Sequence, residues 1–171
     1  MRSIALAGTV LALTGLGVAP ALATQSAPDA GDTERQRGVV LECTGTADGL
    51  SAYVNLYEND TYTNYVQVVL NDDPRLARSR EPADILSDGE VRAGVRIKGH
   101  QARVTGTAHR IGKRKPVHEE IEDAGNLVVS DGFHRRLRND LALTYRGAKV
   151  PLSCAPAFYY DLEVTTTPVV D

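Results

Sequence analysis

Two cysteines, Cys43 and Cys154, give this chain its clearest chemical signal. Each lies in a segment where apolar residues alternate, and neither belongs to a Cys-x-x-Cys pair or adjoins an obvious activating base. A pair of this kind in an exported protein is typically oxidised. We predict one disulfide between them, which in the chain-entropy account contributes on the order of 4–5 kcal/mol. Two free buried thiols are the alternative.

The histidines and most acids match no catalytic or metal-binding motif. Histidines stand at positions 100, 109, 118 and 134, without the close pair of a zinc site. Residues 49–53 lack the final glycine of a hydrolase elbow. The acids that a glycosidase could use are Glu119, Glu120, Glu122 and Asp123, but this cluster more simply balances neighbouring lysines and arginines. We expect no metal and no cofactor, and we lean toward a non-enzymatic protein.

A row of basic residues could form a binding surface. Arg92, Arg96, Lys98 and Arg103 fall on the outward face of a predicted hairpin. The expected register places Arg96 directly opposite Arg103, which destabilises a sheet unless an anion or an acid lies over the pair. One interpretation is a docking face for an acidic protein or an anionic polysaccharide. The other, which we favour, is neutralisation by acids of residues 112–140 or by Glu163.

Four tyrosines form a second candidate surface. Tyr53, Tyr57, Tyr62 and Tyr65 lie on two predicted strands, residues 51–58 and 61–70, around a turn at Asn59 and Asp60. The expected register places Tyr57 opposite Tyr62. Exposed tyrosine beside asparagine is typical of recognition sites. Tyrosine is also an ordinary strand residue, so packing beneath a loop is the favoured alternative.

The N-terminus has the form of an export signal. Arg2 is followed by an uncharged apolar stretch over residues 4–17 and by small residues at Ala21 and Ala23. The stretch is too short for the roughly 20 residues of a membrane span. The next segment has no large apolar side chain to offset the entropy of ordering. We therefore predict a signal peptide over residues 1–23, a disordered leader over residues 24–37 and a single β-domain over residues 38–171, in a secreted, periplasmic or extracellular protein.

Strict alternation of apolar and polar residues predicts two hairpins. The first covers residues 91–108, with its turn at residues 99–100. Glycine at the first central position there suits a type II′ turn. The second covers residues 141–154, with its turn at residues 147–148. Its inward face includes Cys154, as the disulfide requires.

These patterns predict an all-β fold, an antiparallel barrel or sandwich of about eight to ten short strands. A barrel is preferred because closure removes exposed edges. A last strand is expected over residues 159–166, with weaker candidates at residues 116–121 and 126–130. Two charged connections, residues 71–89 and 112–140, are long enough to be functional or disordered.

The function is expected to be binding of a macromolecular partner, a protein or a glycan of the cell envelope or exterior. The net charge of −3 argues against a nucleic-acid partner. A secreted hydrolase with acids in the long loops is one alternative. A small-ligand barrel with room beside Ala93, Ala102, Gly106 and Ala108 is another. In outline the chain resembles periplasmic C-type lysozyme inhibitors, but it has no counterpart of their serine-glycine segment, so no residue role is carried over. The sequence does not predict the oligomeric state.

Overall fold

The computed structural model describes residues 31–169 of the chain. The signal peptide predicted over residues 1–23 lies outside these residues. In chain order the elements are β1 (Asp32–Ala47), β2 (Leu50–Asn59), β3 (Tyr65–Leu70), the 3-10 turn η1 (Pro74–Leu76), β4 (Ala77–Arg80), β5 (Leu86–Ser87), β6 (Glu90–Ile97), β7 (His100–Arg110), β8 (Lys115–Asp123), β9 (Asn126–Tyr145) and β10 (Ala148–Pro168).

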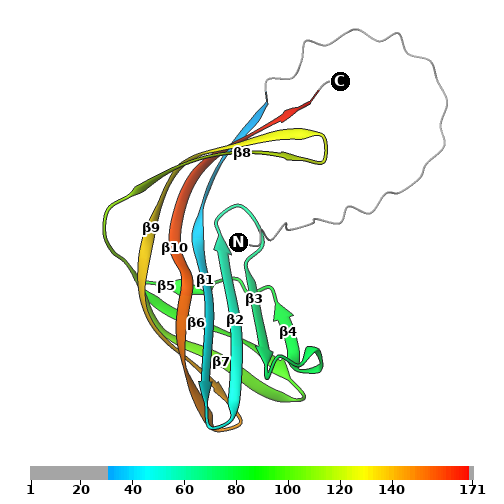
Figure 1. The fold of residues 1–171 in the computed structure, drawn as a ribbon, viewed down its shortest axis with the longest axis vertical. Helices are drawn as coiled ribbons and strands as arrows, with labels where there is room; N and C mark the ends of the chain where they lie inside the picture. Colours follow the sequence, from blue (N-terminus) through cyan, green and yellow to red (C-terminus); the bar gives the residue numbers. More distant parts are fainter. Residues whose placement is uncertain (1–30, 170–171) are drawn as a thin grey trace, which may run out of the picture.

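One antiparallel sheet contains all ten strands, in the order β4-β3-β2-β1-β10-β9-β7-β6-β5, with β8 paired to β9. The sheet curls into a half-barrel (Figure 1). The predicted all-β antiparallel class is therefore confirmed. The fold is barrel-like, as preferred from the sequence, but it is a half-barrel made of one curled sheet, because the strand order ends at β4 and β5.

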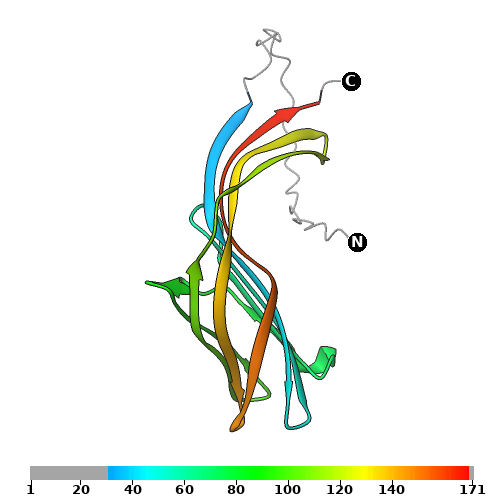
Figure 2. The same cartoon turned by 60° about the vertical axis from the view of Figure 1, so that its left-hand side comes forward.

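The sheet has two regions that differ in how they are covered. We call residues 38–110 and 137–157 the body, and residues 32–37, 115–136 and 158–168 the arm. The arm consists of the outer parts of β1, β9 and β10 together with β8, and it extends beyond the curled body in both views (Figures 1 and 2).

The core lies on the inner side of the body, where alternate residues of each strand point. Along β2, for example, the buried residues are Ala52, Val54 and Leu56, while their neighbours are half-buried. The small residues that were predicted to leave room for a ligand, Ala93, Ala102 and Ala108, are themselves buried in this apolar cluster. The largest fully buried side chains are Leu41, Leu56, Leu70, Ile85, Ile97 and Leu143.

The predicted disulfide between Cys43 and Cys154 is present. The two cysteines are direct partners in the pairing of β1 with β10, beside an irregularity that begins after Leu41. They are 111 residues apart in the chain. The bond therefore joins neighbouring central strands and closes a loop that contains most of the body.

Both predicted hairpins form, but each turn lies one residue earlier than predicted. Lys98 and Gly99 have φ values of 45° and 81°, and Arg146 and Gly147 have φ values of 50° and 88°. Positive φ at both central residues defines a type I′ turn, in which glycine takes the second position and not the first. The register moves by an even number of residues, so the predicted inward faces are kept.

The segments predicted as long connections contain strands. Residues 71–89 include η1, β4 and β5, and residues 112–140 include β8 and most of β9. The weaker strand candidates at residues 116–121 and 126–130 are therefore confirmed as parts of β8 and β9. Charged side chains lie on both faces of β8, so the apolar alternation that marks a half-buried strand is missing there. Among residues 31–169, no helix has the length and apolar character needed to cross a membrane.

The first strand begins inside the segment that was expected to be a leader. Residues 32–37 pair with the far end of β10, where Asp32 lies opposite Thr166. Arg35 also donates two hydrogen bonds to the Asp161 carboxylate, at 2.8 and 2.9 Å. This segment is ordered by pairing with a strand that is distant in the sequence. Such pairing cannot be predicted from the apolar content of the segment itself.

Candidate binding surface

The candidate surface is built on the connection between β2 and β3, residues 59–64. The sequence predicted a tight turn here, but β3 begins only at Tyr65. The side chain of Asn59 sets the path of the longer turn. Its Oδ1 accepts the backbone N–H groups of Thr61 at 2.7 Å and Tyr62 at 2.9 Å, which is the local bonding typical of asparagine in turns.

Asn59 is itself held in a buried polar cluster. It is 5% exposed, and its Nδ2 donates to the hydroxyls of Tyr57 at 2.9 Å and Tyr160 at 2.6 Å. Its backbone N–H donates to Oδ1 of Asn64. Burial, and then the neighbouring Tyr57 hydroxyl, raise the pKa of Tyr160, so this phenol stays neutral. The cluster meets the hydrogen-bonding needs of a buried amide.

The other side of the turn is fixed by an ion pair between Asp60 and Arg37. The Asp60 carboxylate accepts the Arg37 backbone N–H at 2.7 Å and its Nε–H at 2.8 Å. The Asp60 N–H returns a bond to the Arg37 carbonyl. Partial burial acts to raise the pKa of Asp60, but the hydrogen bonds and charge of Arg37 outweigh it and the pKa is lowered. Asp60 is therefore held ionised.

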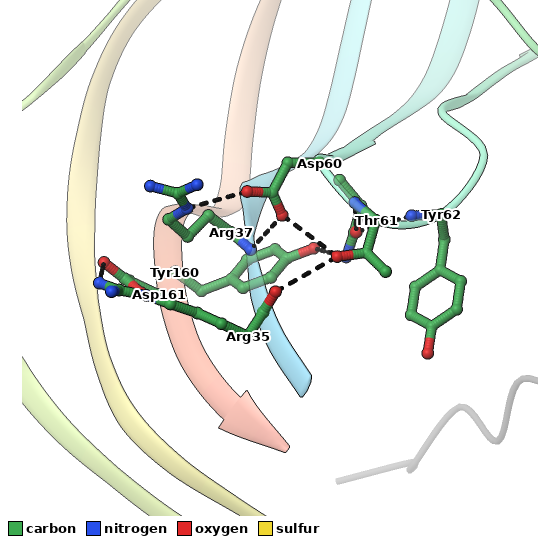
Figure 3. Close-up of polar contacts among 8 residues, drawn as sticks. Arg35, Arg37, Asp60, Thr61, Tyr62, Tyr160 and Asp161 are labelled. Carbon is green, nitrogen blue, oxygen red and sulfur yellow. Dashed lines mark hydrogen bonds and ion pairs between the residues drawn. The ribbon is translucent and has the colours of Figure 1, made fainter. Parts of the chain in front are cut away.

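Tyr62 projects from this fixed turn into solvent. It is 56% exposed, the highest value among the exposed large apolar residues of the described chain. Figure 3 shows its ring directed away from the Arg37–Asp60 pair. Its hydroxyl meets Nε2 of Gln36 at 3.4 Å. Of the four tyrosines that the sequence singled out, Tyr62 is the exposed one.

The other three predicted tyrosines are half-buried on the outer face of β2 and β3. Tyr57 pairs with Tyr65, and not with Tyr62 as predicted, because the turn is longer than two residues. Tyr53 donates to the Glu42 carboxylate at 3.0 Å. Burial, and then Glu42, raise the pKa of Tyr53 to about 12. Tyr57 and Tyr65 therefore adjoin the turn, whereas Tyr53 lies further along the sheet, opposite Val69.

Two further residues, Tyr160 and Gly38, are essential to this arrangement and were not predicted from the sequence. Tyr160 stacks on Tyr57 with ring centroids 6.4 Å apart. It also covers Gly38, where a Cβ would lie 2.6 Å from the Tyr160 hydroxyl. The role of Asn59 depends on Tyr160, which is 101 residues away in the chain. A glycine paired with an aromatic residue across strands is a signal that only the correct register reveals.

An open cleft of about 890 Å³ adjoins the turn, and Tyr62 is not part of its lining. Arg37, Asp60 and Asn64 line it together with Arg110 and Tyr159, and the Arg110 guanidinium lies 3.4 Å from the Tyr159 ring centroid. The cleft also contains Glu58, Asp84, Asp88 and His109. Its perturbed carboxyl is Asp60, whose pKa is lowered. That direction is opposite to the one required of a general acid at neutral pH.

Three of the predicted basic residues, Arg92, Arg96 and Arg103, lie on the outer face of β6 and β7, and the fourth, Lys98, lies in the turn between these strands. Arg96 pairs with Gln101, and Arg103 pairs with Gly94, so the predicted Arg96–Arg103 opposition is wrong. The shifted turn at Lys98 and Gly99 is the cause. Of the acids expected to neutralise this surface, Glu163, Asp131 and those of β8 lie in the arm, whereas Asp140 lies in the body on β9, opposite Thr107.

The acids considered for hydrolysis do not converge with the cleft. Glu119, Glu120, Glu122 and Asp123 are exposed on β8. His118 on the same strand contacts Asp131 on β9, with Nδ1 and Oδ1 2.6 Å apart. Within residues 31–169, no group of three or more His, Cys, Asp or Glu side chains is arranged to hold a metal ion.

No family model, no curated protein and no solved structure matches this chain.

Proposed function

We propose that this chain is an exported, non-enzymatic β-domain that binds a protein of the cell envelope or exterior, with Tyr62 as the anchor of the interface. The observation that carries the proposal is the exposed Tyr62 ring on a turn whose backbone is fixed by buried side chains. The export signal in the sequence and the disulfide support a location outside the cytosol.

Pre-organisation is the first part of the argument. A flexible loop loses conformational entropy when a partner orders it, and this loss weakens binding. The turn at residues 59–64 has little conformational entropy left to lose, because Asn59 and Asp60 already form hydrogen bonds that hold its backbone. Tyrosine adds large contact area at low entropic cost. An exposed Tyr62 held in this way therefore favours recognition.

The surroundings of Tyr62 also suit a protein partner. Arg35 and Arg37 lie on the adjacent edge of β1, and each is paired with an acid and still largely exposed. Tyrosine and arginine are the residues most enriched at binding hot spots, where a polar rim surrounds an aromatic anchor. Tyr57 and Tyr65 extend the aromatic surface onto the sheet.

Affinity capture with the mature protein tests the proposal. The disulfide-bonded domain would be immobilised and exposed to cell-envelope and culture-medium fractions of the source cells, and the retained partner then purified. We expect Tyr62→Ala to weaken its binding by about 30-fold, as for a hot-spot residue. Ile121→Ala, which removes another exposed apolar side chain, is the matched control. A partner that binds wild type and Tyr62→Ala equally would refute the assignment.

A further inference from the structure

Three arginines surround a single glycine on the outer face of the body. Gly94 on β6 lies directly opposite Arg103 on β7. Arg92 and Arg96 lie two residues to either side of Gly94 on the same face, since alternate strand residues share a face. Both are therefore diagonal neighbours of Arg103, and the backbone positions of diagonal neighbours are about 7–8 Å apart. Long arginine side chains can reach one point from these positions.

Gly94 contributes no side chain to the space between the arginines, and the Gln101 amide lies over it, with Nε2 2.9 Å from the position that a Cβ would take. A Cβ at Gly94 would lie 2.5 Å from the Ala102 carbonyl oxygen, so the backbone there admits no side chain. A groove of about 660 Å³ runs over this position. Its lining includes Arg92, Arg103 and Arg80 from β4, together with Gln101, Thr105 and the acid Glu90. Arg96 is not part of this lining and lies beside the groove, where it bonds the Gly99 carbonyl.

The positive charge of this groove is incompletely balanced within the chain. Arg92 pairs with Glu90 at 2.6 Å, and Arg96 donates to the Gly99 carbonyl at 3.3 Å. Among the described residues, no carboxylate lies within ion-pairing distance of Arg80, Arg96 or Arg103. Like charges placed this close destabilise a sheet unless an anion lies between them.

We propose that Arg92 and Arg103, with Arg80 from β4 and with Arg96 beside the groove, form a cradle next to Gly94 that binds the sulfate, phosphate or carboxylate groups of an anionic polysaccharide. Arginine suits such groups because its planar donors bond two oxygens at once. A polysaccharide fits the groove better than a protein partner, because its lining has no exposed aromatic or large aliphatic anchor. The cradle is separate from the Tyr62 turn and does not depend on the function proposed for it.

A binding titration at low salt tests the cradle. The probe is a fluorescently labelled, heparin-type sulfated polysaccharide, with neutral dextran and polyglutamate as comparisons. We expect saturable binding that weakens as salt rises, with preference for the sulfated chain. Arg103→Gln should lower the affinity about tenfold, as loss of a hydrogen bond to a charged group does.

Two controls make the titration decisive. Lys115→Gln removes the same charge from exposed β8 in the arm and should leave the affinity unchanged, as should Tyr62→Ala. Equal losses in Arg103→Gln and Lys115→Gln would mean general charge attraction and would overturn the cradle. Preference for polyglutamate would overturn the choice of a polysaccharide in favour of an acidic protein. Absence of saturable binding to the sulfated chain would also refute the proposal.

Discussion

The body and the arm share the strands β1, β9 and β10, yet different forces hold the two regions. In the body, alternate residues of every long strand enter one apolar cluster. In the arm, the buried residues are Tyr159 and Tyr160, which lie at its junction with the body. Backbone pairing continues from one region into the other without a break between β1 and β10 at this junction. Hydrogen-bonded pairing therefore extends well beyond the apolar core that stabilises the sheet.

Polar contacts between strands take the place of a core in the arm. Arg35 bonds Asp161 across β1 and β10, and the hydroxyls of Thr33 and Thr165 meet at 3.0 Å. Exposed pairs of this kind each contribute little. We therefore expect local opening of the arm at lower free energy than global unfolding, and the following experiments test this difference.

Removal of the disulfide should have the largest effect. Cys43→Ala/Cys154→Ala frees a loop of 111 residues, and we expect the free energy of unfolding to fall by about 2–5 kcal/mol. Denaturant titration of the variant and of the oxidised wild type measures this loss. A loss below about 0.5 kcal/mol would mean that the core and the β1–β10 pairing already restrict the unfolded chain, against the entropic account.

Truncation of one apolar side chain in each region tests the contrast directly. Leu56 is fully buried and Ile121 is 50% exposed. We expect Leu56→Ala to lower the free energy of unfolding by about 2–5 kcal/mol, and Ile121→Ala to change it by less than about 0.5 kcal/mol. Both values come from urea titration of purified protein. A similar cost for the two variants would show that the apolar side of the arm is covered in solution.

The same contrast explains what the sequence could predict. The body follows from alternation of apolar residues, so its hairpins and its inward faces were predicted. Each turn contains the glycine that was predicted for it, but the glycine takes the second central position and not the first. This one-residue error produced the false Arg96–Arg103 pair. In the arm, β8 has the sequence KPVHEEIED, in which charge outweighs alternation. A strand that depends on its neighbours and not on burial gives little local signal.

The candidate surface shows the same limit. The tyrosines near Asn59 were identified as a candidate surface, with packing beneath a loop as the favoured alternative, but the sequence did not show which of them is exposed. That choice depends on the longer turn and on Tyr160, which belongs to the last strand. The Gly94 cradle likewise exists only in the observed register. The sequence therefore predicted which kinds of residues form the candidate surfaces. It did not predict which of them lie together, because that depends on pairing between distant segments.

Asn59 lies where the body meets the arm and should have an intermediate effect. Asn59→Ala removes the acceptor for two backbone N–H groups and leaves the buried Tyr160 hydroxyl with one partner fewer. We expect a loss of about 1–3 kcal/mol in the free energy of unfolding. Asn55→Ala, on the outer face of β2, is the matched control and should cost less. Thermal unfolding followed by circular dichroism measures both, and equal losses would argue against the special role of Asn59.

The smallest effect concerns pH and should be confined to the arm. The hydrogen bond to Asp131, and then its charge and that of Glu120, raise the pKa of His118 above its ordinary 6.5. Glu163 on β10 lies opposite Asp131 and adds to the negative surroundings. Because this pKa is raised in the folded state, the folded protein binds the His118 proton more tightly than the unfolded chain does. The stabilisation that protonated His118 contributes is therefore fully present below the ordinary pKa and is lost as pH rises through the folded-state pKa.

Histidine titration by NMR and hydrogen exchange of β8 amides measure this effect together. We expect the pKa of His118 to lie above 6.5, and β8 amides, corrected for intrinsic exchange, to lose protection as pH rises through it. His118→Gln should remove this pH dependence while protection in β2 and β7 stays constant. A pKa at or below the ordinary value, or parallel loss of protection in the body, would contradict a local ion pair. In either case the His118–Asp131 contact would not stabilise the arm, and β8 would be held mainly by its backbone pairing with β9.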